Sequence, residues 1–384
     1  MKKIVISLFI LISILLLPTN IVTVKAQTLE EEINSQLSNV DFSEFNTLYE
    51  QLGEIYQDYD FFSFVSNVLK GNLNADYDSM FSYFFSTFIG QTYNFIPIAL
   101  TILAISLLTG IMSKLKSGYL SDGVEEIISL ICVFLTITLI FNHFISVYKS
   151  AVNVIDKVSK LNQVVSPILL TLMIASGGSV SASVYKPIVS LLSGSIINIF
   201  ITVLIPLVGL MTVLMIISNF SENIKLNKFL ELITSIIKWV IGISVAIFGI
   251  FLTAQGIVAS VHDGISFRAT KYAISNSIPL IGGFLSNGLD LVLSGSILIK
   301  NAIGISSIFL LVFLILTPVL NMLSLSLVLK VCSGFSECFD NVKISSICST
   351  LSKCITYLIV IVLMVGFMFF ITLLLMIFSA NTFI

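Results

Sequence analysis

Residues 255–304 read QGIVASVHDGISFRATKYAISNSIPLIGGFLSNGLDLVLSGSILIKNAIG and separate two long apolar segments. Charged and helix-breaking residues gather in this stretch: Asp263, Arg268, Lys271, Pro279, Gly282, Gly283 and Lys300. Arg268 is the single arginine of the chain. A charge at membrane depth is costly and is kept mainly where it has a partner or a role. These residues are therefore the candidate functional residues.

The composition predicts a membrane protein. Hydrophobic residues make up 57% of the chain and charged residues 10%, whereas charged residues are about 25% of a soluble domain. The apolar runs are long and continuous, as helices require, and lack the short alternating strands of a barrel. We therefore predict an all-α, polytopic helical membrane protein whose first partner is the lipid bilayer. The net charge of −2 and the lack of a basic tract predict no nucleic-acid partner.

Six segments are long enough to cross a hydrocarbon core of about 30 Å: 94–112, 127–147, 188–217, 234–259, 305–329 and 355–378. The run 164–175 is short and ends in Ser-Gly-Gly-Ser, so it could form a re-entrant or broken element. The run 188–217 is long and contains Pro206, which is compatible with one kinked helix or a helical hairpin. The prediction is therefore six to eight transmembrane helices.

The N-terminus carries export signals. Residues 1–26 have a lysine-rich start, a short apolar core and small residues before Gln27, which predicts a cleavable signal peptide. An uncleaved first membrane helix is the alternative. Residues 27–92 form an acidic tract with near-helical apolar spacing, which predicts a small exported segment of amphipathic helices. Residues 93–384 form the multi-pass membrane domain.

Membrane orientation depends on the run 164–186. If it does not cross, the positive-inside rule places a set of later lysines in the cytoplasm and 260–302 outside; they are Lys225, Lys228, Lys330, Lys343 and Lys353. If it crosses, both assignments reverse.

One predicted helix has a stripe of small residues. Gly242, Ala246 and Gly249 follow each other at steps of four and three within the segment 234–259. Such spacing keeps them on one helix face, and small residues let membrane helices approach closely. We predict a close helix contact here, either within the bundle or between copies in a homo-oligomer.

Three classes of function suit a membrane protein of this kind: a conduit or scaffold, a stand-alone secondary transporter and an intramembrane enzyme. The chain has no P-loop, no G-x-G-x-x-G, no H-E-x-x-H and no G-x-S-x-G motif, so we predict a non-enzymatic protein without catalytic, cofactor or metal residues. In membrane proteins, a broken helix beside charged residues often lines a site. Asp263 and Arg268 are candidates for a charge pair. An ordinary polar loop between spans is the alternative for this stretch. For the whole chain, the alternative is a stand-alone secondary transporter, although no convincing internal repeat is present.

The central stretch resembles a known family. Residues 263–271 (DGISFRATK), 278–283 (IPLIGG) and 300–304 (KNAIG) resemble the stage III sporulation protein AE family of endospore-forming bacteria. The resemblance covers essentially the whole order of segments. It implies a multi-pass protein of the mother-cell membrane in a secretion-like channel to the forespore, needed for late forespore development. The partners it implies are the other stage III A-operon proteins, including an ATPase and ring-forming components, and indirectly a forespore-membrane protein.

Overall fold

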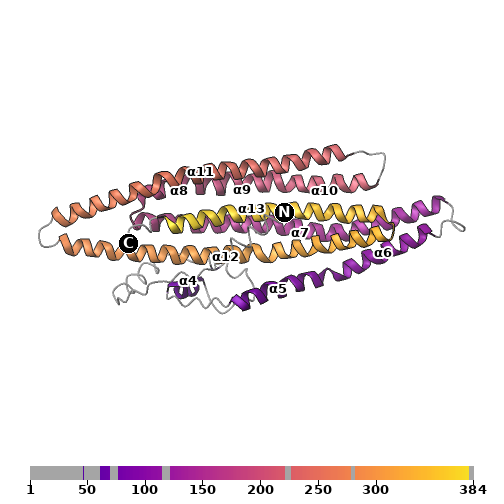
Figure 1. Cartoon of the computed structure of the whole chain (residues 1–384), viewed down its shortest axis with the longest axis horizontal. Helices are drawn as coiled ribbons and strands as arrows, with labels where there is room; N and C mark the ends of the chain where they lie inside the picture. The colour runs from indigo at the N-terminus through magenta and orange to yellow at the C-terminus, as the bar shows by residue number, and fades with distance from the viewer. Residues whose placement is uncertain are drawn as a thin grey trace.

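The structure is a computed structural model that describes residues 46, 61–69, 77–114, 122–220, 226–277 and 282–379. The predicted signal peptide, most of the acidic segment and Pro279 lie outside these residues. Within them the chain is entirely helical (Figure 1). The all-α prediction is confirmed for this part of the chain.

Long helices run back and forth along one axis and give the molecule an elongated shape (Figure 1). A short helix, α4 (Phe61–Leu69), precedes them. The long elements in chain order are α5 (Tyr77–Asn94) with α6 (Ile96–Lys114), α7 (Asp122–Ala175), the run α8 (Ser179–Ser190) to α10 (Ile205–Phe220), α11 (Asn227–Ser277), α12 (Gly282–Cys338) and α13 (Val342–Phe378).

Six of the described helical stretches are long and apolar enough to cross a membrane: Ser82–Met112, Ile127–Ala175, Ser179–Ser218, Lys228–Thr253, Val292–Cys338 and Val342–Phe378. Each overlaps a predicted segment, which supports the prediction of a polytopic protein. Six is the lowest number in the predicted range of six to eight transmembrane helices. The helices exceed the predicted spans. α7 has 54 residues and α12 has 57, whereas about 20 residues cross a bilayer.

The run 164–175 is the continuous last part of α7, so its interpretation as a broken element is wrong. α7 ends in a turn where the Gly177 N–H donates to the Ile174 carbonyl at 3.0 Å and the Gly178 N–H to the Met173 carbonyl at 2.8 Å. Gly177 has a positive φ of 85°, which glycine adopts without a steric penalty. Residues 164–186 thus form the tip of the hairpin between α7 and α8 and are not a separate helix of membrane-crossing length.

The run 188–217 is one helix, so its interpretation as a hairpin is wrong. α8 continues through a π-helical segment (Leu191–Ile196), α9 (Ile197–Ile199) and a second π-helical segment (Phe200–Leu204) into α10. The second segment ends two residues before Pro206. Proline has no N–H for the α-helical ladder, and a local π-helical register is one way a helix accommodates it.

The stretch 255–304 is helical on both sides of a break. Residues up to Ser277 continue α11, and α12 begins at Gly282. The interpretation of the whole stretch as a polar loop is therefore wrong, because 255–277 and 282–304 are helical. The end of α11 and the start of α12 lie together at one extreme end of the molecule (Figure 1).

The core of the bundle lies between α12, α13 and α7. α12 and α13 are the most buried of the long helices. Two glycines permit their contact, because a side chain at Gly304 would overlap Ile377 and one at Gly366 would overlap Ile315. Small residues at helix crossings are the usual means of close packing in membranes.

Candidate functional site around the buried Lys300

Lys300 is the candidate residue that the structure places most clearly. It lies on α12 with no exposed surface, and its Nζ donates a hydrogen bond to the carbonyl oxygen of Ser379. Ser379 is the C-cap of α13, with an extended backbone. The ammonium group therefore joins α12 to the end of α13.

The end of α13 is a favourable place for a cation. The last carbonyls of a helix lack intrahelical partners and carry its negative partial charge. The Tyr185 hydroxyl, from α8, approaches the Leu375 carbonyl of the same helix end at 3.5 Å. Two donors from separate helices thus converge on the C-terminal turn of α13, and both lie within the bundle.

Further polar groups surround this point. Ser296 lies one helical turn before Lys300 and is buried. The buried Oδ1 of Asn301 finds no hydrogen-bond donor among the described residues. A buried acceptor costs free energy unless another group donates a hydrogen bond to it. Lys300 and Asn301 together make this end of α12 the most polar buried part of the predicted site.

A seam of hydroxyl groups continues between α12 and α13. The Oγ atoms of Ser326 and Ser352 lie 2.9 Å apart, and the Ser352 hydroxyl also donates to the Ser326 carbonyl at 2.9 Å. Two turns further along, the Ser333 hydroxyl donates to the Ser345 carbonyl at 2.9 Å. Hydrogen bonds of this type hold membrane helices together. Sequence reasoning missed them, although each helix shows its serine pair at a spacing of seven.

The Ser326 and Ser352 hydroxyls are expected to be energetically coupled. A double-mutant cycle with Ser326→Ala and Ser352→Ala should give a coupling free energy of about 0.6 kcal/mol, and at most about 1.7 kcal/mol. Unfolding of the purified protein in mixed detergent micelles measures it. Ser183→Ala combined with Ser352→Ala is the control, because the exposed Ser183 hydroxyl bonds within its own helix. Equal coupling in both pairs would contradict the hydrogen-bonded seam.

The other predicted residues of the 255–304 stretch are separated from Lys300 along the hairpin. Asp263, Arg268 and Lys271 lie in the last third of α11, and Gly282 and Gly283 form the first turn of α12. They surround the tip of the hairpin, whereas Lys300 lies deeper in α12. The predicted set is therefore two groups, one at the tip and one at the end of α13.

The small-residue stripe on α11 does not pack inside the bundle. Gly242 and Ala246 are exposed and Gly249 is partly exposed. Among the described residues, no other segment comes within 4 Å of a Cβ built at Gly242 or Gly249. The described helices therefore do not supply the intramolecular contact, because they meet α11 on its opposite face. Contact with a second copy stays a prediction.

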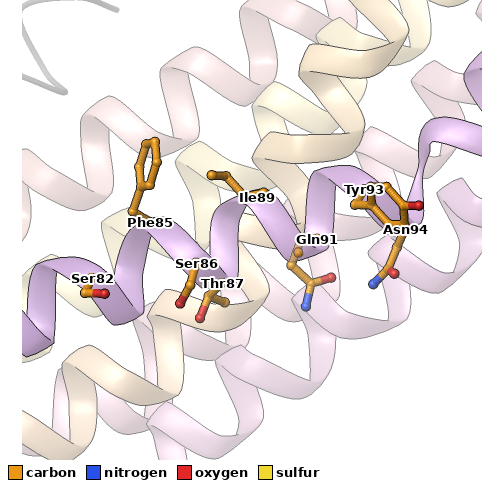
Figure 2. Close-up of a pocket in the computed structure, with 9 residues that line it drawn as sticks. Ser82, Phe85, Ser86, Thr87, Ile89, Gln91, Tyr93 and Asn94 are labelled. Atoms are coloured by element: carbon orange, nitrogen blue, oxygen red, sulfur yellow. The ribbon is translucent and has the colours of Figure 1, made fainter.

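A shallow hollow lies along α5, far from Lys300 in the sequence. Figure 2 shows its residues on one helix, with Phe85 on one side and Ser86, Thr87 and Gln91 on the other. Its lining comes from α5 alone and mixes hydroxyl, amide and aromatic side chains. It is an open helix surface and not an enclosed binding site.

Six long apolar helices with lysine, asparagine and serine groups buried between them define the class, a multi-pass helical membrane protein. The chain belongs to the stage III sporulation protein AE family, whose model matches residues 59–380. It is 26% identical over 281 residues to the stage III sporulation protein AE of Bacillus subtilis (strain 168), covering 73% of this chain and 70% of that protein. No solved structure matches the chain. The resemblance carried by residues 255–304 is thus confirmed at the level of the family.

Proposed function

We propose that this protein is a non-enzymatic membrane component of a secretion-like channel complex between mother cell and forespore. The observation that carries the proposal is membership of the sporulation family over residues 59–380. Polar and charged side chains on helices of membrane-crossing length support it, because such groups mark pathways and contacts more often than inert packing. The partners in this proposal are the other stage III A-operon proteins, including the ATPase and the ring-forming components.

The distribution of lysines supports one orientation. The helices α6, α10 and α12 end, and the helices that follow them begin, at the same end of the molecule (Figure 1). The lysines near these helix ends in the sequence are Lys114, Lys116, Lys225, Lys228, Lys330 and Lys343. The positive-inside rule favours this end for the mother-cell cytoplasm. The tip between α11 and α12 then faces the space between the two membranes, together with the predicted acidic segment.

A deletion strain tests the proposal. Removing the gene from its spore-forming host should stop forespore development after engulfment and leave vegetative growth unchanged. The tagged full-length protein, crosslinked in sporulating cells, should co-purify with the stage III A-operon ATPase and the ring-forming components. Normal spores from the deletion strain, or recovery of the protein without these partners, would contradict the channel role.

The tip of the α11–α12 hairpin is the proposed working surface. Arg268→Ala should reduce heat-resistant spores by about tenfold or more while the protein still accumulates, because a charge kept in a membrane helix usually has a specific partner. Spore counts and immunoblots measure the two quantities. Lys228→Ala is the matched control, since Lys228 is exposed at the opposite end and pairs with Glu231 at 3.1 Å. Equal spore counts in the two variants would make the tip a solvated connection.

A further inference from the structure

The outward face of α7 changes its chemistry along the helix. In its first third this face presents large apolar side chains, including Ile127, Ile131 and Phe134, which are 59%, 54% and 61% exposed. From residue 142 onward the same face carries polar side chains instead: Asn142, Lys149, Asn153, Asp156, Lys160 and Gln163. These six residues recur at helical spacing and are exposed or partly exposed. We call them the α7 polar stripe.

Along the axis of the bundle, the stripe is level with an uncharged surface on the run α8–α10. α7 and the run α8–α10 form a hairpin whose turn is at residues 176–178, so residues equally far from that turn lie side by side. The Tyr148 ring lies 3.5 Å from a Cβ built at Gly209, which confirms this register. The stripe is therefore level with Ile199 and Val203, which are 39% and 41% exposed.

The exposed side chains of this run, which include Ser195, Asn198 and Thr202 beside Ile199 and Val203, carry no charge and can face lipid, whereas the stripe carries charges. The Lys160 Nζ and the Asp156 Oδ2 lie 2.8 Å apart, with side chains 62% and 49% exposed. A charged group in hydrocarbon costs several kcal/mol unless it reaches water or a partner. Lysines near a helix end can extend to the interface. The stripe from Lys149 to Gln163 covers about 21 Å of helix, however, which is most of a hydrocarbon core of about 30 Å. Extension to an interface cannot serve all of it.

We propose that the α7 polar stripe faces a water-filled path at membrane depth, and that this path favours anions over cations. The inference rests on the proposed channel role and names the surface that would serve it. Three lysines, Lys149, Lys157 and Lys160, outnumber Asp156 on this part of α7. A wall with net positive charge raises the local concentration of anions. One helix face cannot enclose water, so other subunits supply the remaining walls.

Cysteine labelling tests the path in membranes from sporulating cells, broken open so that reagent reaches both sides. Each variant has its native cysteines replaced and carries one new cysteine. Asn153→Cys is the first site, and Ser146→Cys is a second site on the same exposed face. Val203→Cys is the control at matched height. The probes are a small anionic sulfonate and a small cationic trimethylammonium thiol reagent, neither of which crosses lipid. Asn153→Cys should react about tenfold or more faster than Val203→Cys.

Charge preference is the second measurement. Relative to their rates with a free thiol, the anionic reagent should label Asn153→Cys several-fold faster than the cationic one. Lys149→Glu in the same chain should reduce or reverse that ratio, because it removes a positive charge one turn away. Immunoblots report whether each variant accumulates. If Asn153→Cys does not, Ser146→Cys supplies the same comparison.

Three results would overturn the inference or part of it. Labelling at Asn153→Cys and Ser146→Cys as slow as at Val203→Cys would mean that protein or lipid seals this face of α7. Spontaneous disulfide dimers at Asn153→Cys in place of labelling would mean that a second copy covers it. Equal rates for the two reagents would overturn the anion preference. The channel role fails separately: normal spores from the deletion strain, with rapid labelling, would leave an aqueous surface without a role in sporulation.

Discussion

Alanine at Gly110 is expected to destabilise the protein, whereas alanine at Gly242 is expected to leave its stability unchanged or slightly higher. A Cβ at Gly110, on α6, would lie 2.5 Å from the Phe339 carbonyl oxygen and 3.2 Å from the Phe339 Cβ. A backbone carbonyl cannot rotate away as a side chain can. The new methyl group must therefore push α6 away from the turn between α12 and α13.

That turn is held firmly and has little room to move. The Asn341 N–H donates to the Ser336 carbonyl at 3.0 Å, and the Asp340 N–H donates to the Glu337 carbonyl at 3.0 Å. Asp340 has a positive φ of 63°, a left-handed conformation that such helix-ending turns require. The Asn341 side chain then caps α13 by accepting from the Ile344 N–H at 3.3 Å. A shift of Phe339 would disturb this whole connection.

The two alanine substitutions should therefore have opposite signs. Overpacking costs about 1 to 3 kcal/mol, which exceeds the gain of about 1 kcal/mol from replacing a helical glycine by alanine. Gly242 meets no other segment within 4 Å among the described residues, so only the gain remains. Gly110→Leu should remove most of the protein from the membrane, whereas Gly242→Leu should accumulate normally unless a second copy packs there.

Immunoblots of membranes and thermal unfolding of the purified variants measure these effects. The substitutions are matched in chemistry and in helical context, so a general effect of alanine in a membrane helix cancels. Equal stability of Gly110→Ala and Gly242→Ala would show that α6 does not lie against the turn. A marked loss of accumulation at Gly242→Leu alone would point to an oligomer contact along the α11 stripe.

The apolar segments could be predicted from sequence because a bilayer imposes one requirement on every span, a run of about 20 apolar residues. The full helix lengths could not. Polar residues such as Lys149 and Lys160 interrupt the apolar signal, but helical hydrogen bonds do not depend on polarity, and α7 continues through them. A hydropathy window therefore ends where the chemistry changes and not where the helix ends.

Only part of the candidate site could be predicted from sequence, because residue types do not show every contact. Lys300 could be selected as a charge in an apolar context, but its acceptor is the Ser379 carbonyl, 79 positions along the chain. A backbone acceptor leaves no trace in residue types. The small-residue stripe did not identify its packing partner, because spacing identifies a helix face but not what lies opposite. The glycines that permit close contact, Gly304 and Gly366, belong to no repeated pattern.

Loss of the Lys300 side chain is expected to destabilise the junction of α8, α12 and α13. Lys300→Ala removes a fully buried side chain and leaves the Ser379 carbonyl without this donor. Truncation of a large buried side chain costs about 2 to 5 kcal/mol, and an unpaired buried acceptor adds about 1 to 3 kcal/mol. We expect a total of at least about 3 kcal/mol, seen as a lower unfolding temperature and a large loss of spores.

Lys300→Met separates volume from hydrogen bonding. Methionine nearly fills the same space but donates no hydrogen bond, so its cost should be confined to the unpaired carbonyl, about 1 to 3 kcal/mol. Lys228→Met is the control for loss of a lysine, because that side chain is 90% exposed and its ion pair with Glu231 contributes little.

Replacement of a buried charge by an apolar side chain can also be neutral when the charge was poorly compensated. If Lys300→Met unfolds at the wild-type temperature, the bond to the end of α13 does not stabilise the fold. If Lys300→Met still fails to form spores, the ammonium group serves the function of the complex.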